Sequence, residues 1–164
     1  MSSKILLLSD THGTYDDFIN KYISDVDEIW HAGDIGSMDV IKKLEAKAPL
    51  RAVYGNIDDY RIRKSFPEYY FFEKEGVKVL MLHIGGYPGR YSPRAKELIR
   101  QFNPDIFISG HSHILKVMQD PVNNLLHMNP GAAGKSGFHR VRTMLRFELE
   151  EGKINNLQVI ERKR

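Results

Sequence analysis

Short apolar runs that alternate with amphipathic segments constrain the fold of this chain more than any other feature. In the first third of the sequence the apolar runs have the length of buried strands, and the segments between them repeat apolar side chains at helical spacing. We therefore expect strands at residues 5–8, 28–31 and 50–54, and helices at residues 15–23 and 38–47. Strands alternating with helices predict βαβ units and a parallel sheet.

The rest of the chain is richer in predicted strands. Runs at 69–73 and 78–83 are separated by a segment with a turn-forming glycine, and a helix is expected at 92–102. Further strands are expected at 106–109, 114–119, 125–128, 144–149 and 154–160, with a hairpin turn at Glu151-Gly152 before the last. An α/β fold, as a two-sheet sandwich flanked by helices, accounts for both halves. With 164 residues, 41% hydrophobic and 27% charged, we expect a single domain over residues 1–164.

Composition excludes several classes of protein. The chain has no cysteine, so any metal must be held by oxygen and imidazole ligands. No apolar run approaches the roughly 20 residues that cross a bilayer, and no basic-then-apolar leader precedes the first strand, so we expect a cytoplasmic protein. The net charge of +3 comes from Lys and Arg scattered among 21 acids, which argues against a nucleic-acid partner.

Polar residues gather where the predicted strands end. Five of the first six predicted strands lead into Asp, Asn or His, and the residues concerned are Asp10, His12, Asp34, Asn56, His83, His111 and His113. Each has an ordinary alternative when taken singly: Asp34 as a helix cap, Asn56 in a turn, a lone His in the core. Open α/β sheets build their sites at the carboxyl ends of strands, so the whole set predicts a metal site.

The order of these residues resembles a known family. The sequence resembles the calcineurin-like metallophosphoesterase superfamily, in its small single-domain phosphodiesterase branch, through Asp10-x-His12, Gly33-Asp34, Gly55-Asn56, His83 and Gly110-His111-x-His113. Asn129-Pro130-Gly131 is similar to a turn common in that branch, so the resemblance spans residues 8–131. It implies the two-sheet α/β/β/α sandwich of that family.

The resemblance also implies two metal ions. The first ion would be held by Asp10, His12, Asp34 and His113, and the second by Asp34, Asn56, His83 and His111. Asp34 would bridge the two ions. Two such ions about 3.5–4 Å apart acidify a bridging water, so we expect in-line attack of hydroxide on phosphorus without a protein nucleophile. Mn²⁺ is favoured, and Fe, Zn²⁺, Co²⁺ or Ni²⁺ also suit these ligands.

The chain departs from the family pattern beside Asn56. Many members have a His there that protonates the leaving group, followed by an acid that orients it; here the positions hold Ile57 and Asp58. We predict His139 as the replacement acid, with His127 and His31 as weaker candidates and a surface-loop role as the alternative for His139. Asn56, Asp58 and Arg90 are predicted to contact substrate, and Arg142 is a further candidate phosphate ligand. Leu115 replaces a common proline.

The sequence fits other functions less well. Residues 129–136 (NPGAAGKS) differ from a P-loop only at the first position, but Gly137 interrupts the helix that a P-loop needs, so Lys135 is expected in an exposed turn. A non-catalytic scaffold, as in the retromer subunit that resembles this fold, is the alternative function. A small diester, such as a cyclic nucleotide or nucleotide derivative, is preferred as the substrate class over phosphoproteins. Exposed aromatic residues at 69–72 suggest a homodimer.

Overall fold

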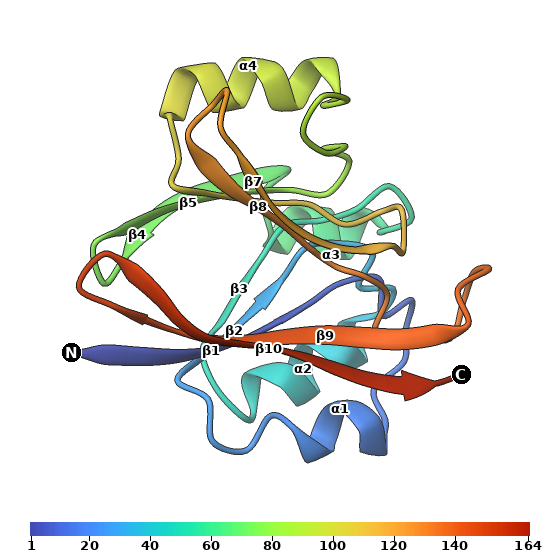
Figure 1. Ribbon diagram of the computed structural model, residues 1–164. Coiled ribbons are helices and arrows are strands. Elements are labelled where there is room, and N and C mark those ends of the chain that lie inside the picture. The colour runs from blue at the N-terminus through green and yellow to red at the C-terminus, as the bar shows by residue number, and fades with distance from the viewer.

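Two five-stranded mixed sheets face each other in the computed structural model, which describes residues 1–164 (Figure 1). The first sheet has the order β10-β9-β1-β2-β3. Its strands are β1 (Ser2–Leu8), β2 (Glu28–His31), β3 (Leu50–Ala52), β9 (Val141–Glu150) and β10 (Lys153–Lys163). β1 pairs parallel to β2 and β2 to β3, whereas β9 runs antiparallel to both β1 and β10.

The second sheet has the order β4-β5-β6-β8-β7. Its strands are β4 (Tyr69–Lys74), β5 (Val77–Leu82), β6 (Ile106–Ile108), β7 (Leu115–Asp120) and β8 (Leu125–Pro130). The three central strands β5, β6 and β8 are parallel, and the two edge strands are antiparallel to their neighbours.

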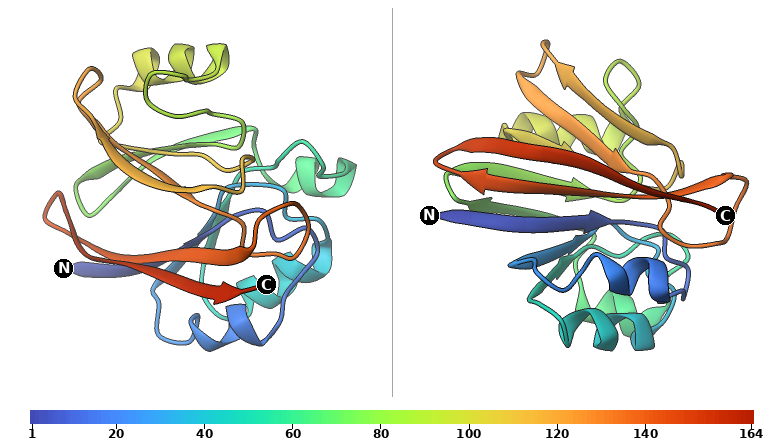
Figure 2. Two further views of the ribbon diagram at one scale, coloured as in Figure 1. Left: turned by 45° about the vertical axis from the view of Figure 1, so that its right-hand side comes forward. Right: turned by 60° about the horizontal axis from the view of Figure 1, so that its bottom comes forward.

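Four helices lie around the two sheets. They are α1 (Asp17–Lys21), α2 (Met38–Glu45), α3 (Tyr60–Ser65) and α4 (Pro93–Phe102). α1 and α2 lie outside the first sheet and α4 lies outside the second, as Figures 1 and 2 show. The predicted α/β/β/α sandwich is therefore confirmed. No helix has both the length and the apolar character to cross a bilayer.

β1 shows why a continuous apolar run marks a central strand. Leu6 and Leu8 pack in the core beneath α1 and α2, while Ile5 and Leu7 pack between the two sheets, and all four are fully buried. Successive side chains of a strand point to opposite faces, so a strand that is covered on both sides has no polar position. This two-sided packing fixes the end of β1 and with it the loop that follows.

One helix was not predicted, and one expectation about local structure was wrong. Helix α3 was missed because it has six residues and buries only Ile62, so it lacks an apolar stripe; the Asp59 carboxylate caps it. The aromatic residues at 69–72 do not form an exposed patch. Phe72 is buried, and Phe71 stacks on Phe102 with ring centroids 4.6 Å apart, so this segment gives no support to a homodimer.

The parallel strands of both sheets end on the same side of the molecule. β1, β2 and β3 in one sheet, and β5 and β6 in the other, run directly into the loops that carry the predicted ligands. Backbone hydrogen bonds tie these loops together: Asp10 N–H donates to Gly33 O (2.9 Å) and Gly110 N–H donates to His83 O (3.0 Å). The sandwich therefore presents residues distant in sequence at one place.

Candidate metal centre

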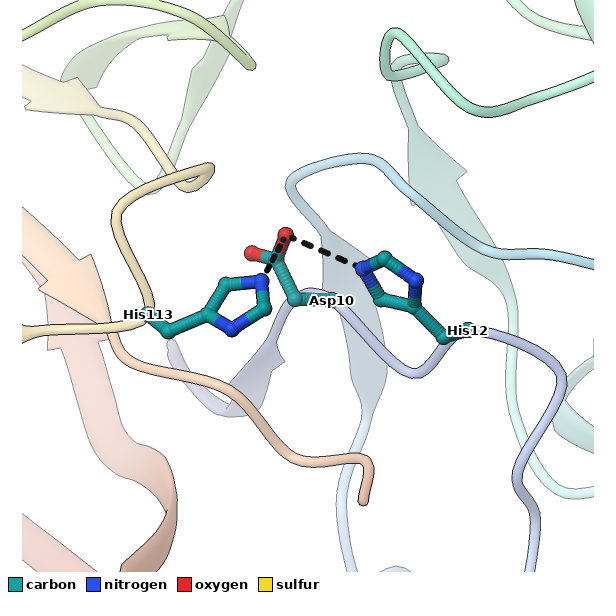
Figure 3. Close-up of side chains that lie close together, drawn as sticks. All are labelled: Asp10, His12 and His113. Carbon is teal, nitrogen blue, oxygen red and sulfur yellow. Dashed lines mark ion pairs between the residues drawn. The ribbon is translucent and has the colours of Figure 1, made fainter. Parts of the chain in front are cut away.

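Three of the predicted ligands meet around one carboxylate oxygen. The Nε2 atoms of His113 and His12 lie 3.2 Å and 3.8 Å from Oδ1 of Asp10, and both rings turn toward that carboxylate (Figure 3). The three ligand atoms lie within 4.8 Å of one another. We call Asp10, His12 and His113 the first ligand group.

A second ligand group lies beside the first and consists of Asp34, His83 and His111. His83 Nε2 is 3.2 Å from Asp34 Oδ2. Asn56 joins this group, because its Oδ1 atom lies 3.0 Å from Nδ1 of His111. His83 is buried, whereas Asn56 and His111 are exposed, so the second group opens to solvent on one side.

Asp34 stands between the two groups. Its Oδ2 atom is 3.2 Å from His83 Nε2 of the second group and 3.4 Å from His12 Nε2 of the first. One carboxylate thus faces imidazoles of both groups, which is the position expected of a bridging ligand.

The polar atoms at the centre fit divalent cations. Asp10 Oδ1, His12 Nε2 and His83 Nε2 are buried and make no hydrogen bond within the protein, although buried polar atoms are nearly always paired. The other oxygen of Asp10 is occupied, since Ser9 Oγ–H (2.6 Å) and His111 N–H (3.1 Å) donate to Oδ2. Ligands bonded to one ion at about 2.0–2.2 Å lie roughly 3–3.5 Å apart, close to most of the separations observed.

The backbone at the ligands is unusual. Five of the seven ligand residues adopt left-handed φ angles between 47° and 73°, namely Asp10, His12, Asp34, His111 and His113. Such residues cost about 1–3 kcal/mol each and persist only where the surroundings hold them. Here the loop-to-loop hydrogen bonds do so; for example, His12 N–H donates to Asp34 O (3.0 Å).

His83 is held in one orientation. Its Nδ1 lies 2.7 Å from the carbonyl oxygen of Ala32, so Nδ1–H donates there and Nε2 is left to face Asp34. An imidazole fixed through its other nitrogen is the usual arrangement of a metal-binding His. Gly33 makes this contact possible, because a Cβ at that residue would lie 2.6 Å from His83 Nδ1.

Electrostatics keep the carboxylates ionised. Burial opposes the charge of Asp10, but the nearby His113 and His12 outweigh it and hold its pKa below the ordinary value. Burial likewise opposes the charge of Asp34, yet His83 keeps the pKa of Asp34 below its usual range. The pKa of His83 is raised, because its contact with Asp34 outweighs the effect of burial. The two carboxylates therefore stay ionised and can attract cations.

Asp58 braces the ligand loops and does not face a substrate. It is 3% exposed, and its carboxylate accepts hydrogen bonds from the backbone N–H groups of Ile35 (3.1 Å), Gly36 (2.8 Å) and Gly55 (2.8 Å). The predicted contact of Asp58 with substrate is wrong, because both oxygens are engaged. Instead, Asp58 ties the loop that carries Asp34 to the loop that carries Asn56.

Gly55 lets the second loop approach the bridging residue. A Cβ at Gly55 would lie 2.1 Å from Asp34 Oδ1, which is far inside van der Waals contact. The same Asp34 oxygen accepts a hydrogen bond from the Ile57 N–H group (3.0 Å). Glycine at this position is therefore needed for the Asp34 carboxylate to stay in place.

His139 lies next to the first ligand group, and its Nε2–H is already engaged. Its ring contacts that of His113 edge to face, with centroids 5.2 Å apart. Nε2–H donates to the Gly134 carbonyl (2.9 Å), and burial lowers the pKa of His139, which disfavours the protonated form. The structure gives His139 a packing contact with a ligand rather than the geometry of a proton donor.

His31, a weaker candidate acid, is structural. It is fully buried, its Nδ1 accepts from Gly33 N–H (3.1 Å), and its Nε2 lies 3.0 Å from Thr11 Oγ1. Burial lowers the pKa of His31 to about 4, so the ring is neutral. The ligand loops are also supported by hydrogen bonds of Ser9, Thr11 and His31. Nothing in the spacing of these three residues in the sequence distinguishes them from ordinary strand residues.

Arg142 and Lys135 are paired away from the ligands. Arg142 is 3% exposed and donates two hydrogen bonds of 2.9 Å to Asp16, so it does not bind phosphate. Lys135 Nζ also faces Asp16, at 3.5 Å. Residues 131–140 form no helix, which agrees with the rejection of a P-loop. Arg90 is exposed and lines a cavity that also reaches His111 and His127.

Comparison with known proteins shows the family of this chain. The model of the calcineurin-like phosphoesterase superfamily domain matches residues 4–152. The chain belongs to this superfamily. A probable metallophosphoesterase of Methanothermobacter thermautotrophicus is 34% identical to this superfamily member over 111 residues, which cover 66% of the chain and 61% of that relative's length.

Solved structures share the calcineurin-like fold. A structure described as a novel archaeal phosphodiesterase has 25% sequence identity and a TM-score of 0.71, covering 95% of this chain and 99% of the other. Vps29 from Entamoeba histolytica, solved as a complex with zinc, has 16% identity and a TM-score of 0.73, covering 98% of each chain. The second likeness concerns the fold alone.

Proposed function

We propose that this calcineurin-like phosphoesterase is a phosphodiesterase that hydrolyses a small phosphate ester with two divalent ions. The position of Asp34 carries the proposal, because one of its oxygens faces imidazoles of both ligand groups. Asp10, His12, Asp34 and His113 would hold the first ion, and Asp34, Asn56, His83 and His111 the second. Mn²⁺ is the favoured ion, with Fe, Zn²⁺, Co²⁺ and Ni²⁺ as other candidates.

The side chains of this protein have distinct tasks in that reaction. When bound, the ions supply Lewis-acid contacts to phosphate oxygens and lower the pKa of a water molecule. Asp10 and Asp34 provide the compensating negative charge. Asn56 and His111 are the exposed ligands, so they lie nearest to an incoming ester.

The environment of the leaving group favours activated esters. Ile57 stands at the position of a proton donor, and His139 has its Nε2–H engaged by the Gly134 carbonyl. General acids typically contribute about 10²–10⁴-fold, so a site without one should discriminate strongly by leaving-group acidity. We expect fast hydrolysis of esters whose alcohol is acidic and slow hydrolysis of simple alkyl esters.

The surface beside the second ligand group supports a diester. A cavity of about 220 Å³ adjoins His111, and a separate groove of about 500 Å³ adjoins Asn56 and His83. Ile84 and Ser92 line both. A phosphorus centre at these ligands would therefore have room for one ester group on each side.

An assay with two chromogenic esters tests the proposal. Purified protein with added Mn²⁺ is expected to hydrolyse bis(p-nitrophenyl) phosphate faster than p-nitrophenyl phosphate. A preference for the monoester would contradict the diesterase proposal. The alternative function, a non-catalytic metal-binding scaffold, predicts bound metal with no hydrolysis of either ester.

A further inference from the structure

A side chain outside the two ligand groups grips the loop that carries Asn56. Arg63 lies on α3, and its guanidinium donates from Nε to the Asp58 carbonyl (2.7 Å) and from Nη2 to the Asn56 carbonyl (3.1 Å). Nε–H and Nη2–H lie on one edge of a planar, rigid group, so the two carbonyls are held at a fixed spacing. Arg63 is thus bonded to the main chain of a predicted metal ligand.

This bond is the one hydrogen bond that the Asn56 main chain makes within the protein. The next residue is held from the other side of the loop, where Ile57 N–H donates to Asp34 Oδ1 (3.0 Å). The Asn56 side chain is hydrogen-bonded to His111, but both residues are exposed, so this contact leaves the amide open to solvent. The placement of Asn56 therefore depends on Arg63.

Arg63 is itself held in place. Its Cζ atom lies 4.7 Å from the centroid of the Tyr54 ring, within the range of a cation–π contact. The preceding residue, Ile62, is fully buried in the core, and the Asp59 carboxylate caps α3 by accepting from the N–H groups of Arg61 (3.1 Å) and Ile62 (3.2 Å). The helix that carries Arg63 is short, but it is anchored at its start and on its inner face.

The second ion has more need of a well-placed neutral ligand than the first. Asp34 is the one carboxylate of the second ligand group and would be shared, whereas the first ligand group also has Asp10. Affinity for a cation depends on the charge of its ligands and on the rigidity of the site. Since the second ligand group has less charge, its affinity depends more on rigidity, and Asn56 is its exposed amide.

A contact with substrate phosphate is the other role open to Arg63. It lines the groove of about 500 Å³ together with Asn56 and His83. However, the edge formed by Nε and Nη2, which can hold two phosphate oxygens side by side, already holds two carbonyl oxygens. These bonds favour a role on the loop over a role on the substrate.

We propose that Arg63 is a positioning residue that holds Asn56 in place for the second ion. The inference rests on the two-ion site of the proposed function. Arg63 acts through the Asn56 main chain, and its charge works in the opposite direction, because a guanidinium repels a nearby cation. If charge alone mattered, removal of Arg63 would strengthen binding of the second ion. Positioning predicts that removal weakens it.

Mn²⁺ binding to Arg63→Ala, followed by electron paramagnetic resonance, tests the inference without any substrate. The variant is expected to bind the first ion as the wild-type protein does and the second at least about tenfold more weakly, as for other residues that orient a metal ligand. Arg61→Ala is the matched control, because Arg61 is an exposed residue of the same helix whose side chain makes no hydrogen bond or ion pair. It should bind both ions normally. Unchanged or tighter binding of the second ion in Arg63→Ala would overturn the proposal.

The first ion reports whether Arg63→Ala is otherwise intact, because its ligands Asp10, His12 and His113 lie in other loops. Equal weakening of both ions would indicate general damage and would overturn the proposal. Arg63→Lys keeps the charge but not the two-donor edge, so its second ion should also bind weakly. Wild-type affinity in Arg63→Lys would contradict a grip on two carbonyls.

Inorganic phosphate, titrated into the Mn²⁺-loaded proteins, covers the substrate role. Two normally bound ions in Arg63→Ala, with weaker phosphate binding, would show that Arg63 contacts substrate and would overturn the proposal. The proposed function fails differently. A single ion in the wild-type protein would defeat the two-ion site itself, whereas two equally bound ions in both the wild-type protein and Arg63→Ala would defeat the role of Arg63 alone.

Discussion

The Oδ2 atom of Asp34 lies 3.2 Å from the Nε2 atom of His83. His83 comes 49 positions later in the sequence and lies in a loop of the other sheet. His83 belongs to the loop after β5 and Asp34 to the loop after β2. The contact between Asp34 and His83 joins loops of the two sheets at one site. The Ala32 carbonyl, near Asp34 in the same loop, also orients the His83 ring. Sandwich packing and ligand geometry therefore depend on each other.

Replacing Gly55 by alanine should damage the centre without touching a ligand. The added Cβ would lie 2.1 Å from Asp34 Oδ1 and would displace that carboxylate. We expect bound Mn²⁺ to fall below one ion per chain, measured by elemental analysis after gel filtration. Gly89→Ala is the control, because its Cβ would meet no atom within 4 Å. Its only expected effect is the strain of placing alanine at a φ of +88°, which costs about 1–2 kcal/mol. Similar metal content in the two variants would contradict this explanation.

Asp58→Asn separates a bracing role from a substrate contact. The amide retains one acceptor for three N–H groups, so the free energy of unfolding should fall by about 1–3 kcal/mol in a urea titration. Metal affinity should fall with it, because Asp58 joins the Asp34 and Asn56 loops. If stability were unchanged while KM rose, the carboxylate would contact substrate after all.

Ile57→His should restore a proton donor. Ile57 is 46% exposed, so the larger ring can be accommodated, and its backbone N–H bond to Asp34 Oδ1 does not depend on the side chain. We expect alkyl aryl diesters with poor leaving groups to react at least about tenfold faster, with a smaller gain for p-nitrophenyl esters. His139→Ala is the comparison: it should slow good and poor leaving groups equally. A selective loss for poor leaving groups in His139→Ala would show that His139 is the acid.

The buried imidazoles predict loss of stability in acid. Burial lowers the pKa of His127 to about 4, below its ordinary 6.5, so the unfolded chain binds a proton between these values and the folded chain does not. Stability is therefore expected to fall as pH drops from about 6.5 toward 4. His127→Leu should flatten this dependence, measured as unfolding free energies at pH 7 and pH 5. His31, whose pKa is also lowered to about 4, contributes in the same direction. An unchanged slope in the variant would contradict a neutral, buried His127.

The sequence predicts the strands and the ligand positions well because both depend on local patterns. The apolar runs of β1, β2, β5 and β6 are buried on both faces, and these strands end on the same side of the molecule, so the residues after them converge. The roles of Asp58, His31 and Arg142 were not predictable. Their hydrogen-bond partners lie 23, 20 and 126 residues away or on the backbone, and no spacing in the sequence reports such contacts.

Metal stoichiometry tests the central claim most directly. Protein titrated with Mn²⁺ and followed by electron paramagnetic resonance should bind two ions per chain, with the spin coupling of ions that share a ligand. Asp34→Asn should abolish the spin coupling and lower kcat/KM by at least about 10²-fold. Asp39→Asn, a change at an exposed acid paired with Lys43, should alter neither the coupling nor kcat/KM. A single uncoupled ion in the wild-type protein, or coupling that survives in Asp34→Asn, would contradict an Asp34-bridged pair.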